Sequence, residues 1–293
     1  MQGAVIIGDC LVDEIHTDGQ SPMRFAGGAG LNLAAGVARL GLPATLVTRV
    51  GQDRDGFYLL GYARERSIRV INTPTVDPTG VAVSTRKNGE PSYLFSPSMF
   101  RRRISFPPRV LETIARADAV VVNSYPLDNS EHASALVAAL SCASGLCIAD
   151  PNPRPRLISS IDAFRRGFEM LLKAVDLVKL SDEDAYLLYQ LDWRSTSTRL
   201  FNLGVDTLLF SHGAEGATIV DRTGLCVQVP AASRPEPIVD TMGAGDATLA
   251  SLVASYLRGG PPNSEEVWRR YLSNAMAVAA ATCRHAGAEL VPA

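Results

Sequence analysis

Short segments rich in apolar residues alternate along this chain with segments of helical periodicity, and this alternation restricts the possible folds more than any other feature of the sequence. Apolar segments of this length are typical of strands that are buried on both faces of a sheet. They lie at residues 4–7, 45–50, 67–71, 119–122, 146–149, 177–180 and 207–210. Helices are predicted between and after them, at residues 31–40, 54–66, 107–116, 129–142, 161–174, 181–203, 249–257 and 267–279. Strands that alternate with helices predict an α/β fold with a mostly parallel central sheet.

Two segments depart from this alternation. Between residues 79 and 95, apolar and polar side chains alternate, which predicts a β-hairpin with its turn at 87–90. Because no helix flanks this hairpin, we expect a flap that stands off the main sheet and is joined by the extended segment 11–15. A second hairpin is predicted over 216–229.

The charge balance limits the partners of the chain. Its 28 Lys and Arg residues nearly match its 30 Asp and Glu residues, which leaves a net charge of −2. No general basic field is present, so neither nucleic acid nor an anionic membrane is expected as a partner. Any anionic ligand must therefore be held by a local arrangement of donors.

The cysteines and histidines predict neither a disulfide framework nor a zinc site. The five cysteines are scattered and none forms a C-x-x-C pair, and the four histidines show no ligand spacing. The first residues, MQGAVIIGDC, contain neither a basic region nor an apolar run long enough for a signal peptide or a membrane span. A soluble protein in the reducing cytoplasm is expected.

The segment from Val239 to Ala247 is the strongest local indication of chemistry. Gly243 and Gly245 precede an amphipathic helix, so the N–H groups of its first turn can converge on an anion such as a phosphate. Asp246 would repel a bound phosphate there, but it could accept the proton of a hydroxyl group that attacks the phosphorus. The alternative from the residues alone is that Asp246 caps the helix.

The sequence around these residues resembles the PfkB family of ribokinase-like carbohydrate kinases. DTMGAGDA is similar to the C-terminal signature of that family, and FAGGAGLNLAAGVARLG is similar to its N-terminal signature. Further similar segments are IIGDCLVDEI, RVGQDRDG, DPNPR, KLSDEDAYLL, LFSHGAEGA and NAMAVAAATCRHAGA. The resemblance implies a ribokinase-like three-layer α/β sandwich over residues 1–293, with a small β-strand lid formed by about 11–25 and 79–97.

The resemblance also assigns roles to residues. It implies sugar contacts by the substrate-side residues Asp13, Gly27, Gly28, Asn32 and Arg154. It places Asp246 as the catalytic base beside an anion hole made by Gly243, Ala244 and Gly245. It places along ATP the residues Lys179, Ser211, Gly213, Gly216, Thr241 and Asn274.

Two cations are implied by the same resemblance. Mg²⁺ is assigned to the KLSDEDAYLL segment, where Asp184 stands in place of the usual glutamate and Ser181 in place of the frequent asparagine. The shorter carboxylate of Asp184 would act through water. A monovalent cation such as K⁺ is assigned to Asp240 and the carbonyl groups around 286–287, where many relatives bind one.

Several of these residues also have simpler interpretations. Asp13 is compatible with a turn or a sheet edge, Asn32 with a helix cap, and Arg154 with a salt bridge in a loop. The run Arg101–Arg103 favours a solvated face over a phosphate site, and His212 favours a turn residue over a proton carrier.

Together these features predict ATP-dependent phosphorylation of a primary hydroxyl group on a small sugar, with fructose as the first candidate. Alternatives within the family are 2-keto-3-deoxygluconate kinase, ribokinase and nucleoside kinase. A catalytically silent sugar sensor is an alternative of another class. A dinucleotide-binding oxidoreductase is disfavoured because the segment at 27–30 lacks a complete G-x-G-x-x-G motif. Both a monomer and a homodimer are compatible with the sequence.

Overall fold

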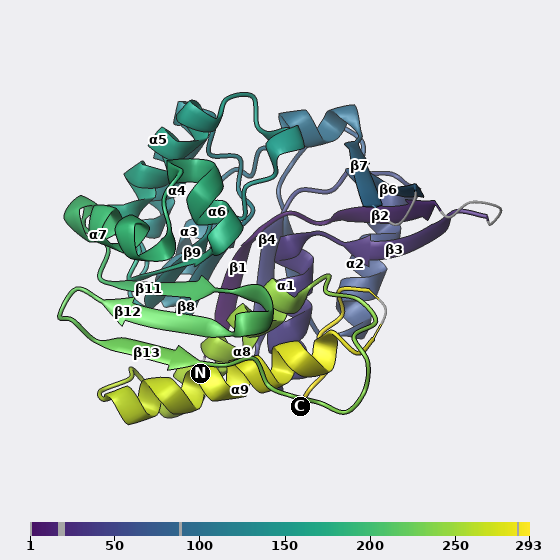
Figure 1. The fold of residues 1–293 in the computed structure, drawn as a ribbon. Coiled ribbons are helices and arrows are strands. Elements are labelled where there is room, and N and C mark those ends of the chain that lie inside the picture. Colours follow the sequence, from purple (N-terminus) through teal and green to yellow (C-terminus); the bar gives the residue numbers. More distant parts are fainter. Residues whose placement is uncertain (1, 17–20, 88–89, 286) are drawn as a thin grey trace.

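The structure is a computed structural model that describes residues 2–16, 21–87, 90–285 and 287–293. Its main feature is a nine-stranded sheet (Figure 1). The strands lie in the order β13 (Cys226–Val229), β12 (Ala217–Asp221), β11 (Thr207–Ser211), β10 (Leu177–Ser181), β9 (Leu146–Asp150), β8 (Ala119–Asn123), β1 (Ala4–Gly8), β4 (Ala44–Thr48) and β5 (Arg69–Asn72). The pairs from β11 through β5 are parallel, whereas β12 and β13 add an antiparallel edge.

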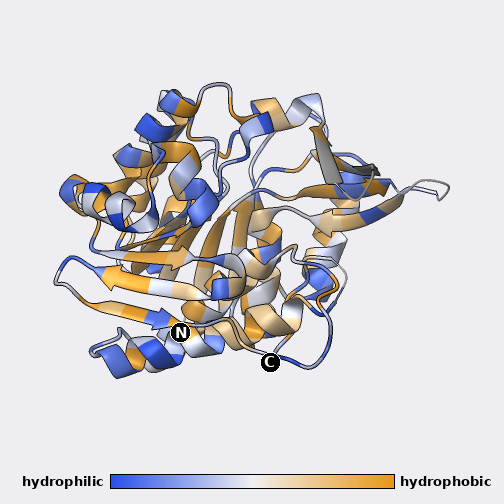
Figure 2. Cartoon of the chain, in the orientation of Figure 1, coloured by the Kyte–Doolittle hydropathy of each residue, from blue (hydrophilic) through white to orange (hydrophobic). Residues whose placement is uncertain are grey.

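The central strands are apolar because both of their faces are covered. In β1, all five residues are buried, and successive side chains enter different clusters: Ile6 packs in one core and Ile7 in the other. The adjacent strand β8 is buried over its whole length in the same way. Figure 2 shows hydrophobic residues concentrated on the central strands and hydrophilic residues on the outer helices.

Helices cover the two faces of the sheet, which confirms the predicted three-layer α/β fold (Figure 1). One face carries α1 (Ala29–Arg39), α2 (Arg54–Glu65), α8 (Ala244–Gly259) and α9 (Glu265–Thr282). The other carries α3 (Pro108–Arg116), α4 (Ser130–Leu140), α5 (Ile161–Leu171), α6 (Asp182–Tyr189) and α7 (Trp193–Leu203). Short 3₁₀ turns lie at η1 (Pro97–Arg101), η2 (Pro155–Leu157), η3 (Leu172–Ala174) and η4 (Gly213–Glu215).

The predicted single helix over 181–203 is wrong, because two helices occupy this segment. Gln190 adopts a left-handed conformation with φ of 56° and ends α6. Asp192 then starts α7 as its N-cap, and its side chain accepts a hydrogen bond from the Ser195 N–H group. A capping aspartate satisfies one of the unpaired N–H groups of a new helix, so the chain turns here without glycine or proline.

A four-stranded sheet stands beside the main sheet and forms the lid. Its order is β3 (Met23–Gly27), β2 (Leu11–His16), β6 (Val81–Lys87) and β7 (Glu90–Phe95). The predicted hairpin and its junction with residues 11–15 are confirmed, and β2 and β6 pair in parallel with Val12 opposite Val81. The centre of the predicted turn, Asn88–Gly89, lies outside the described residues.

The start of β3 falls within the predicted lid segment 11–25, but a separate strand over Met23–Gly27 was not predicted. Its first three residues are exposed, so it lacks the apolar pattern of a buried strand. The strand forms because its backbone pairs with β2, with Leu11 opposite Gly27 and Ile15 opposite Met23. Such long-range pairing overrides a weak local preference.

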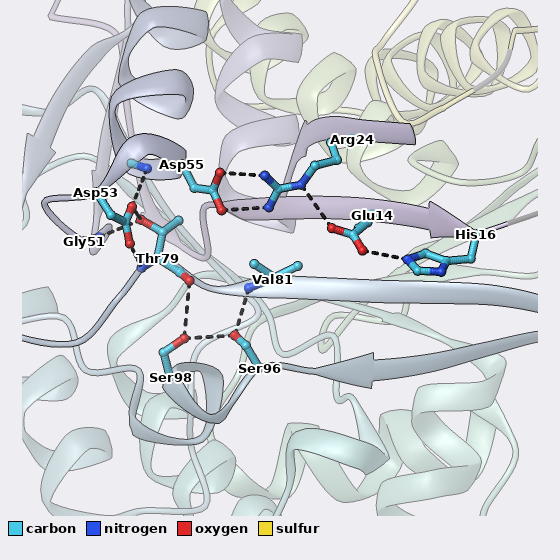
Figure 3. Close-up of polar contacts among 11 residues, drawn as sticks. Glu14, His16, Arg24, Gly51, Asp53, Asp55, Thr79, Val81, Ser96 and Ser98 are labelled. Carbon is cyan, nitrogen blue, oxygen red and sulfur yellow. Dashed lines mark hydrogen bonds and ion pairs between the residues drawn. The ribbon is translucent and has the colours of Figure 1, made fainter. Parts of the chain in front are cut away.

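Polar contacts hold the lid to the body of the molecule (Figure 3). Arg24 of β3 donates two hydrogen bonds to the carboxylate of Asp55 on α2, at 2.8 and 2.7 Å, and its Nε lies 3.1 Å from Glu14 of β2. Asp53 caps α2 and also accepts hydrogen bonds from the N–H and hydroxyl groups of Thr79, at 2.8 and 2.6 Å. Strand β3 and the segment that leads into β6 are therefore both attached to the start of α2.

Within the described ranges, no helix combines the length and the apolar character that crossing a membrane requires.

Candidate active site

The carboxyl ends of the parallel strands bring the polar residues of the site together. On one side of β1 in the sheet lie β4 and then β5, and on its other side lie β8, β9, β10 and β11 in that order. Connections that leave neighbouring strands in opposite directions open a crevice at the carboxyl ends, where α/β proteins bind ligands. Asn123 ends β8 and Asp150 ends β9, so both lie at this edge.

Asp246 lies in this crevice and is held by two side-chain amides. Asn123 Nδ2 donates to its Oδ1 at 2.9 Å, and Asn32 Nδ2 donates to its Oδ2 at 3.3 Å. Burial raises the pKa of Asp246, and the hydrogen bond from Asn123, the charge of Lys179 and the hydrogen bond from Asn32 oppose this rise. The N-cap of α8 is Gly243 and no side-chain cap bond is present there, so Asp246 does not act as a helix cap.

The glycine turn before α8 requires its particular residues. Gly243 has φ of 79°, and a Cβ atom there would lie 2.5 Å from the carbonyl oxygen of Ala288. A Cβ atom on Gly245 would lie 3.4 Å from Nζ of Lys179. The first N–H groups of α8, which include those of Ala244 and Gly245, therefore lie close to the buried ammonium group of Lys179. The N-terminus of a helix and a nearby cation both favour the binding of an anion.

Lys179 forms a buried ion pair with Asp150. Lys179 Nζ lies 2.7 Å from Asp150 Oδ2, and the two residues are 5% and 1% exposed. Burial raises the pKa of Asp150 to about 6 even though Lys179 lowers it. Burial by itself would lower the pKa of Lys179, but the negative charges of Asp150 and Asp184 outweigh it, and the pKa is raised. The lysine that the sequence assigned to ATP thus lies beneath the glycine turn.

The donor set near this pair fits a magnesium ion. The second oxygen of Asp150, Oδ1, is buried without a hydrogen-bond partner. Asp184 lies close enough to influence the pKa of Asp150 electrostatically, and it forms a capping box with Ser181 at the start of α6. No cluster of three or more potential ligands occurs among the residues that the structure describes. Mg²⁺ is commonly held by one or two carboxylates together with substrate phosphates, so this set is sufficient.

Asp13 lies on β2 against the backbone of β3. A Cβ atom on Gly27 would lie 1.8 Å from Asp13 Oδ2, so only glycine leaves room for this carboxylate. Burial raises the pKa of Asp13 to about 6; Arg154 lowers it and Asp246 adds to the rise. Asp13 thus belongs to the same electrostatic site as Asp246, and it is not an isolated turn residue.

Asn32 and Arg154 also differ from their simpler interpretations. Gly28, with φ of 99°, is the N-cap of α1, so Asn32 does not cap that helix. Arg154 forms no ion pair within the described part of the chain, although its charge acts on Asp9, Asp13 and Asp246. The residue as a whole is exposed.

The predicted nucleotide-side residues lie around the turn between β11 and β12. Ser211 ends β11, Gly213 begins η4, and Gly216 follows with φ of 110°. A groove of about 740 Å³ opens beside this turn, with Tyr186 and Trp193 among its lining residues. That volume is typical of small-molecule sites.

The structure gives His212, Thr241 and Asn274 separate environments. His212 is a structural turn residue, because Nδ1 contacts Asp182 at 2.9 Å and Nε2 contacts the Thr218 hydroxyl at 2.8 Å. The carbonyl group of Thr241 accepts a hydrogen bond from the Ala244 N–H group in the glycine turn. Asn274 is exposed on α9.

Asp240 ties the loop before α8 to the segment after α9. Its Oδ1 accepts a hydrogen bond from Met242 N–H at 3.0 Å, and its Oδ2 accepts one from Gly287 N–H at 3.2 Å. This brings together the loops that were predicted to hold a monovalent cation. Ala286 itself lies outside the described residues.

The interpretation of Arg101–Arg103 as a solvated face is wrong for its central residue. Arg102 is 9% exposed, and its Nε lies 3.3 Å from Asp9 Oδ1, just after β1. Arg101 is exposed and pairs with Asp77. The run therefore contributes a buried charge pair at the junction between the body and the lid.

Sequence reasoning missed Asn123, Asp150 and Asp9 as site residues. Each of them ends or follows a strand whose other residues are apolar. A polar residue at the carboxyl end of a predicted parallel strand was therefore the available indication.

Comparison with known proteins decides the family. A family model described as pfkB family carbohydrate kinase matches residues 1–292. The chain belongs to this family. As a pfkB carbohydrate kinase, it is a phosphotransferase that uses an alcohol group as acceptor.

Individual relatives agree with this family. A fructokinase of Klebsiella pneumoniae is 28% identical over 274 residues, which cover 90% of this pfkB kinase and 88% of the relative. A 2-dehydro-3-deoxygluconokinase of Escherichia coli (strain K12) is 26% identical over 274 residues, with coverage of 87% and 88%. The crystal structure of aminoimidazole riboside kinase from Salmonella enterica superposes with a TM-score of 0.82 at 23% identity, covering 98% of this chain and 95% of that one. The last likeness confirms the ribokinase-like fold.

Proposed function

We propose that this pfkB-family protein transfers the γ-phosphoryl group of ATP to a primary hydroxyl group of a small sugar. One observation supports this reaction most strongly: the half-buried carboxylate of Asp246 lies at the first turn of α8, next to Gly243–Gly245, and both of its oxygens receive amide hydrogen bonds. A base beside an anion site is the arrangement that phosphoryl transfer to a hydroxyl group requires.

The proposed reaction follows from the position of each group. The sugar hydroxyl donates its proton to Asp246 while its oxygen attacks the γ-phosphorus, and ADP leaves with the electrons of the broken P–O bond. The N–H group of Gly245 would stabilise the charge on the transferring group, joined by that of Ala244 once it exchanges its 3.3 Å hydrogen bond to the Thr241 carbonyl group for the phosphoryl oxygen, and the nearby Lys179 adds to the positive potential. Mg²⁺, held by Asp150 and Asp184, would neutralise charge on the phosphates of ATP. Asp240 is proposed to support a K⁺ site.

ATP is the proposed donor on two grounds. The neighbour from Salmonella enterica was solved with an ATP analog, and its fold covers nearly the whole of this chain. In addition, the resemblance of the sequence to the family assigns Ser211, Gly213, Gly216, Thr241 and Asn274 to ATP, and the first three lie at one turn between β11 and β12.

The first candidate for the sugar is fructose, because a fructokinase is similar over nine-tenths of the chain. Asp13, Asn32 and the backbone at Gly27–Gly28 would supply acceptors and donors for its hydroxyl groups.

A second candidate is the acidic sugar 2-dehydro-3-deoxygluconate, which is another name for 2-keto-3-deoxygluconate. The observation that favours it is Arg154, whose exposed guanidinium group is free of ion pairs in the described chain and could bind a carboxylate in bidentate fashion. Nucleosides are a third class of candidate substrate, because the superposed structure from Salmonella enterica is a riboside kinase.

We propose that residues 1–293 form a single kinase domain from which the lid sheet projects. Closure of β2, β3, β6 and β7 over the sugar would exclude water and so suppress transfer of the phosphoryl group to water. This arrangement needs no second chain, and it is compatible with both a monomer and a homodimer.

A coupled assay of ADP release, with fructose, ribose, 2-keto-3-deoxygluconate and a nucleoside, tests the proposed function. We expect sugar-dependent and Mg²⁺-dependent ADP release, highest with fructose. Strong activity on the nucleoside with fructose inert would contradict the sugar assignment, and no ADP release with any acceptor, with sugar binding retained, would favour a silent sensor.

Arg154→Ala separates the two sugar candidates. If the substrate is acidic, this variant should lose kcat/KM by roughly 10- to 100-fold, because the guanidinium group loses an ionic partner. With fructose the loss should be less than about threefold, because a neutral sugar offers no bidentate ionic partner.

A further inference from the structure

Asn123 is the side chain in closest contact with Asp246, and its own amide is fully used. It is 0% exposed at the end of β8. Its Nδ2 donates to Asp246 Oδ1 at 2.9 Å and to the carbonyl oxygen of Ala29 at 3.4 Å. Its Oδ1 accepts a hydrogen bond from Asn152 Nδ2 at 3.4 Å. An amide with both donors and its acceptor engaged has one orientation, so its N–H group must point at Asp246.

The backbone around this contact is held in an uncommon conformation. Ser124, the residue after Asn123, has φ of 55°, and Asn152, which orients the amide, has φ of 40°. Non-glycine residues in the left-handed region cost free energy and persist where surrounding contacts enforce them, often at functional sites. Here the two residues follow the neighbouring strands β8 and β9; Ser124 is next to Asn123 in the chain, and Asn152 donates to its amide oxygen.

We propose that Asn123 is a positioning residue for phosphoryl transfer: it fixes Oδ1 of Asp246 and leaves Oδ2 to receive the proton of the sugar hydroxyl. The inference rests on the proposed role of Asp246 as base. Asn32 Nδ2 lies 3.3 Å from Oδ2, whereas Asn123 Nδ2 lies 2.9 Å from Oδ1, so the contact at Oδ2 is longer by 0.4 Å. Oδ2 is therefore the oxygen whose present partner is more easily exchanged for substrate.

The same hydrogen bond sets the charge of the base. A buried carboxylate binds protons more readily because burial disfavours the charged form, and an N–H donor opposes this by stabilising the charge. Burial raises the pKa of Asp246, and Asn123 is the first of the groups that lower it. Loss of the amide should therefore make the base protonated over a wider range of pH, in addition to freeing its orientation.

Asn123→Leu keeps the approximate shape of the side chain and removes both amide groups. Thr48→Val is the matched control: Thr48 is also 0% exposed at the end of a central strand, and its hydroxyl donates to the carbonyl oxygen of Gly8 at 2.7 Å, but it does not contact Asp246. Asn152→Ala is a second test that leaves Asn123 in place and removes only the group that orients its amide. All three are compared with wild type and with Asp246→Asn.

The measurement is the pH dependence of kcat at saturating sugar between pH 5 and 9, because the titration of Asp13 enters kcat/KM through KM. For Asn123→Leu we expect the acidic limb of kcat to move upward by about one pH unit, with roughly tenfold lower kcat below it and a smaller loss at pH 9. Asn152→Ala should shift the limb in the same direction by less, and Thr48→Val should follow the wild-type profile.

Two outcomes would overturn the inference. The first requires that Asp246→Asn is inactive and that the acidic limb of Asn152→Ala is unshifted. In addition, Asn123→Leu either shows an unshifted limb or fails to fold. The other is an equal shift in Thr48→Val, which would show a general structural effect. Near-native turnover by Asp246→Asn would instead contradict the proposed base, so the two failures are distinguishable.

Discussion

Two acids, the buried Asp150 and the half-buried Asp246, share one buried cation, Lys179. Its ammonium group lies 2.7 Å from Asp150 and also lowers the pKa of Asp246. Removing one partner of a buried ion pair leaves an uncompensated charge in a medium of low polarity, which is more costly than losing an exposed pair. The ion pair therefore links the stability of the fold to the charge of the site.

Lys179→Met should lower the free energy of unfolding by about 3–5 kcal/mol, because Asp150 is left buried without its counter-charge. Urea unfolding measures this loss, and Lys173→Met on the exposed surface is the matched control. The double variant Lys179→Met/Asp150→Asn should recover part of the stability. A loss below about 1 kcal/mol for Lys179→Met would contradict the role assigned to the pair.

Asp13 should make sugar binding dependent on pH. Burial raises its pKa to about 6, and protonation turns one of its two acceptor oxygens into a hydroxyl donor, which weakens its hydrogen bonds with sugar hydroxyl groups. KM for the sugar should therefore rise about tenfold as the pH falls from 7 to 5. Asp13→Asn should bind the sugar more weakly and lose this dependence; an unchanged pH profile in that variant would contradict the assignment.

The sign of the linked stability effect is opposite to that of binding. The pKa of Asp13 is higher in the folded state than its usual value of 3.8, so its contribution to stability is complete below that value and is lost as the pH rises through about 6. Asp13→Asn should therefore be more stable than wild type at pH 7, and the difference should disappear near pH 4.

At the scale of elements, the lid is attached through polar contacts at the start of α2. Arg24 connects β3 to Asp55, and Asp53 connects the approach to β6 through Thr79 (Figure 3). The pair of Arg24 is partly exposed, so it adds little to global stability. Its effect is expected instead on where the lid rests over the sugar site.

Arg24→Ala should change the unfolding free energy by less than about 1 kcal/mol and still raise the ratio of ATP hydrolysis to sugar phosphorylation by roughly two- to fivefold. The control is Arg39→Ala, which removes a similarly exposed pair with Glu289 outside the lid. Both rates are measured in one assay with the best sugar. If the ratio in Arg24→Ala equals that of the control, the attachment of β3 does not govern the exclusion of water.

The elements show what the sequence could predict. Strands β1 and β8 were predictable because burial on both faces makes them apolar up to their last residue. Strand β3 was not, because its residues are largely exposed and its strand conformation comes from pairing with β2. The break between α6 and α7 depends on the left-handed Gln190, a residue type that gives no warning of such a turn.

At the scale of the whole molecule, the topology explains why residues distant in sequence meet. Asn32 and Asp246 are 214 positions apart, yet both belong to helices that start at the carboxyl edge of the sheet. The two glycine-rich signatures predicted Asp246 and its anion hole from sequence. Asn123 could not be assigned in this way, because its role depends on the pairing of β8 with β1 and β9 and on the strained turns that follow.

The central claim is that Asp246 is the base of a sugar kinase, and the turnover of Asp246→Asn tests it most directly. Asparagine keeps the shape of the side chain but cannot accept the proton, so kcat should fall by at least ~10²-fold. Calorimetric titration of the same variant should show that sugar binding persists. Near-native turnover with the sugar bound normally would contradict the account.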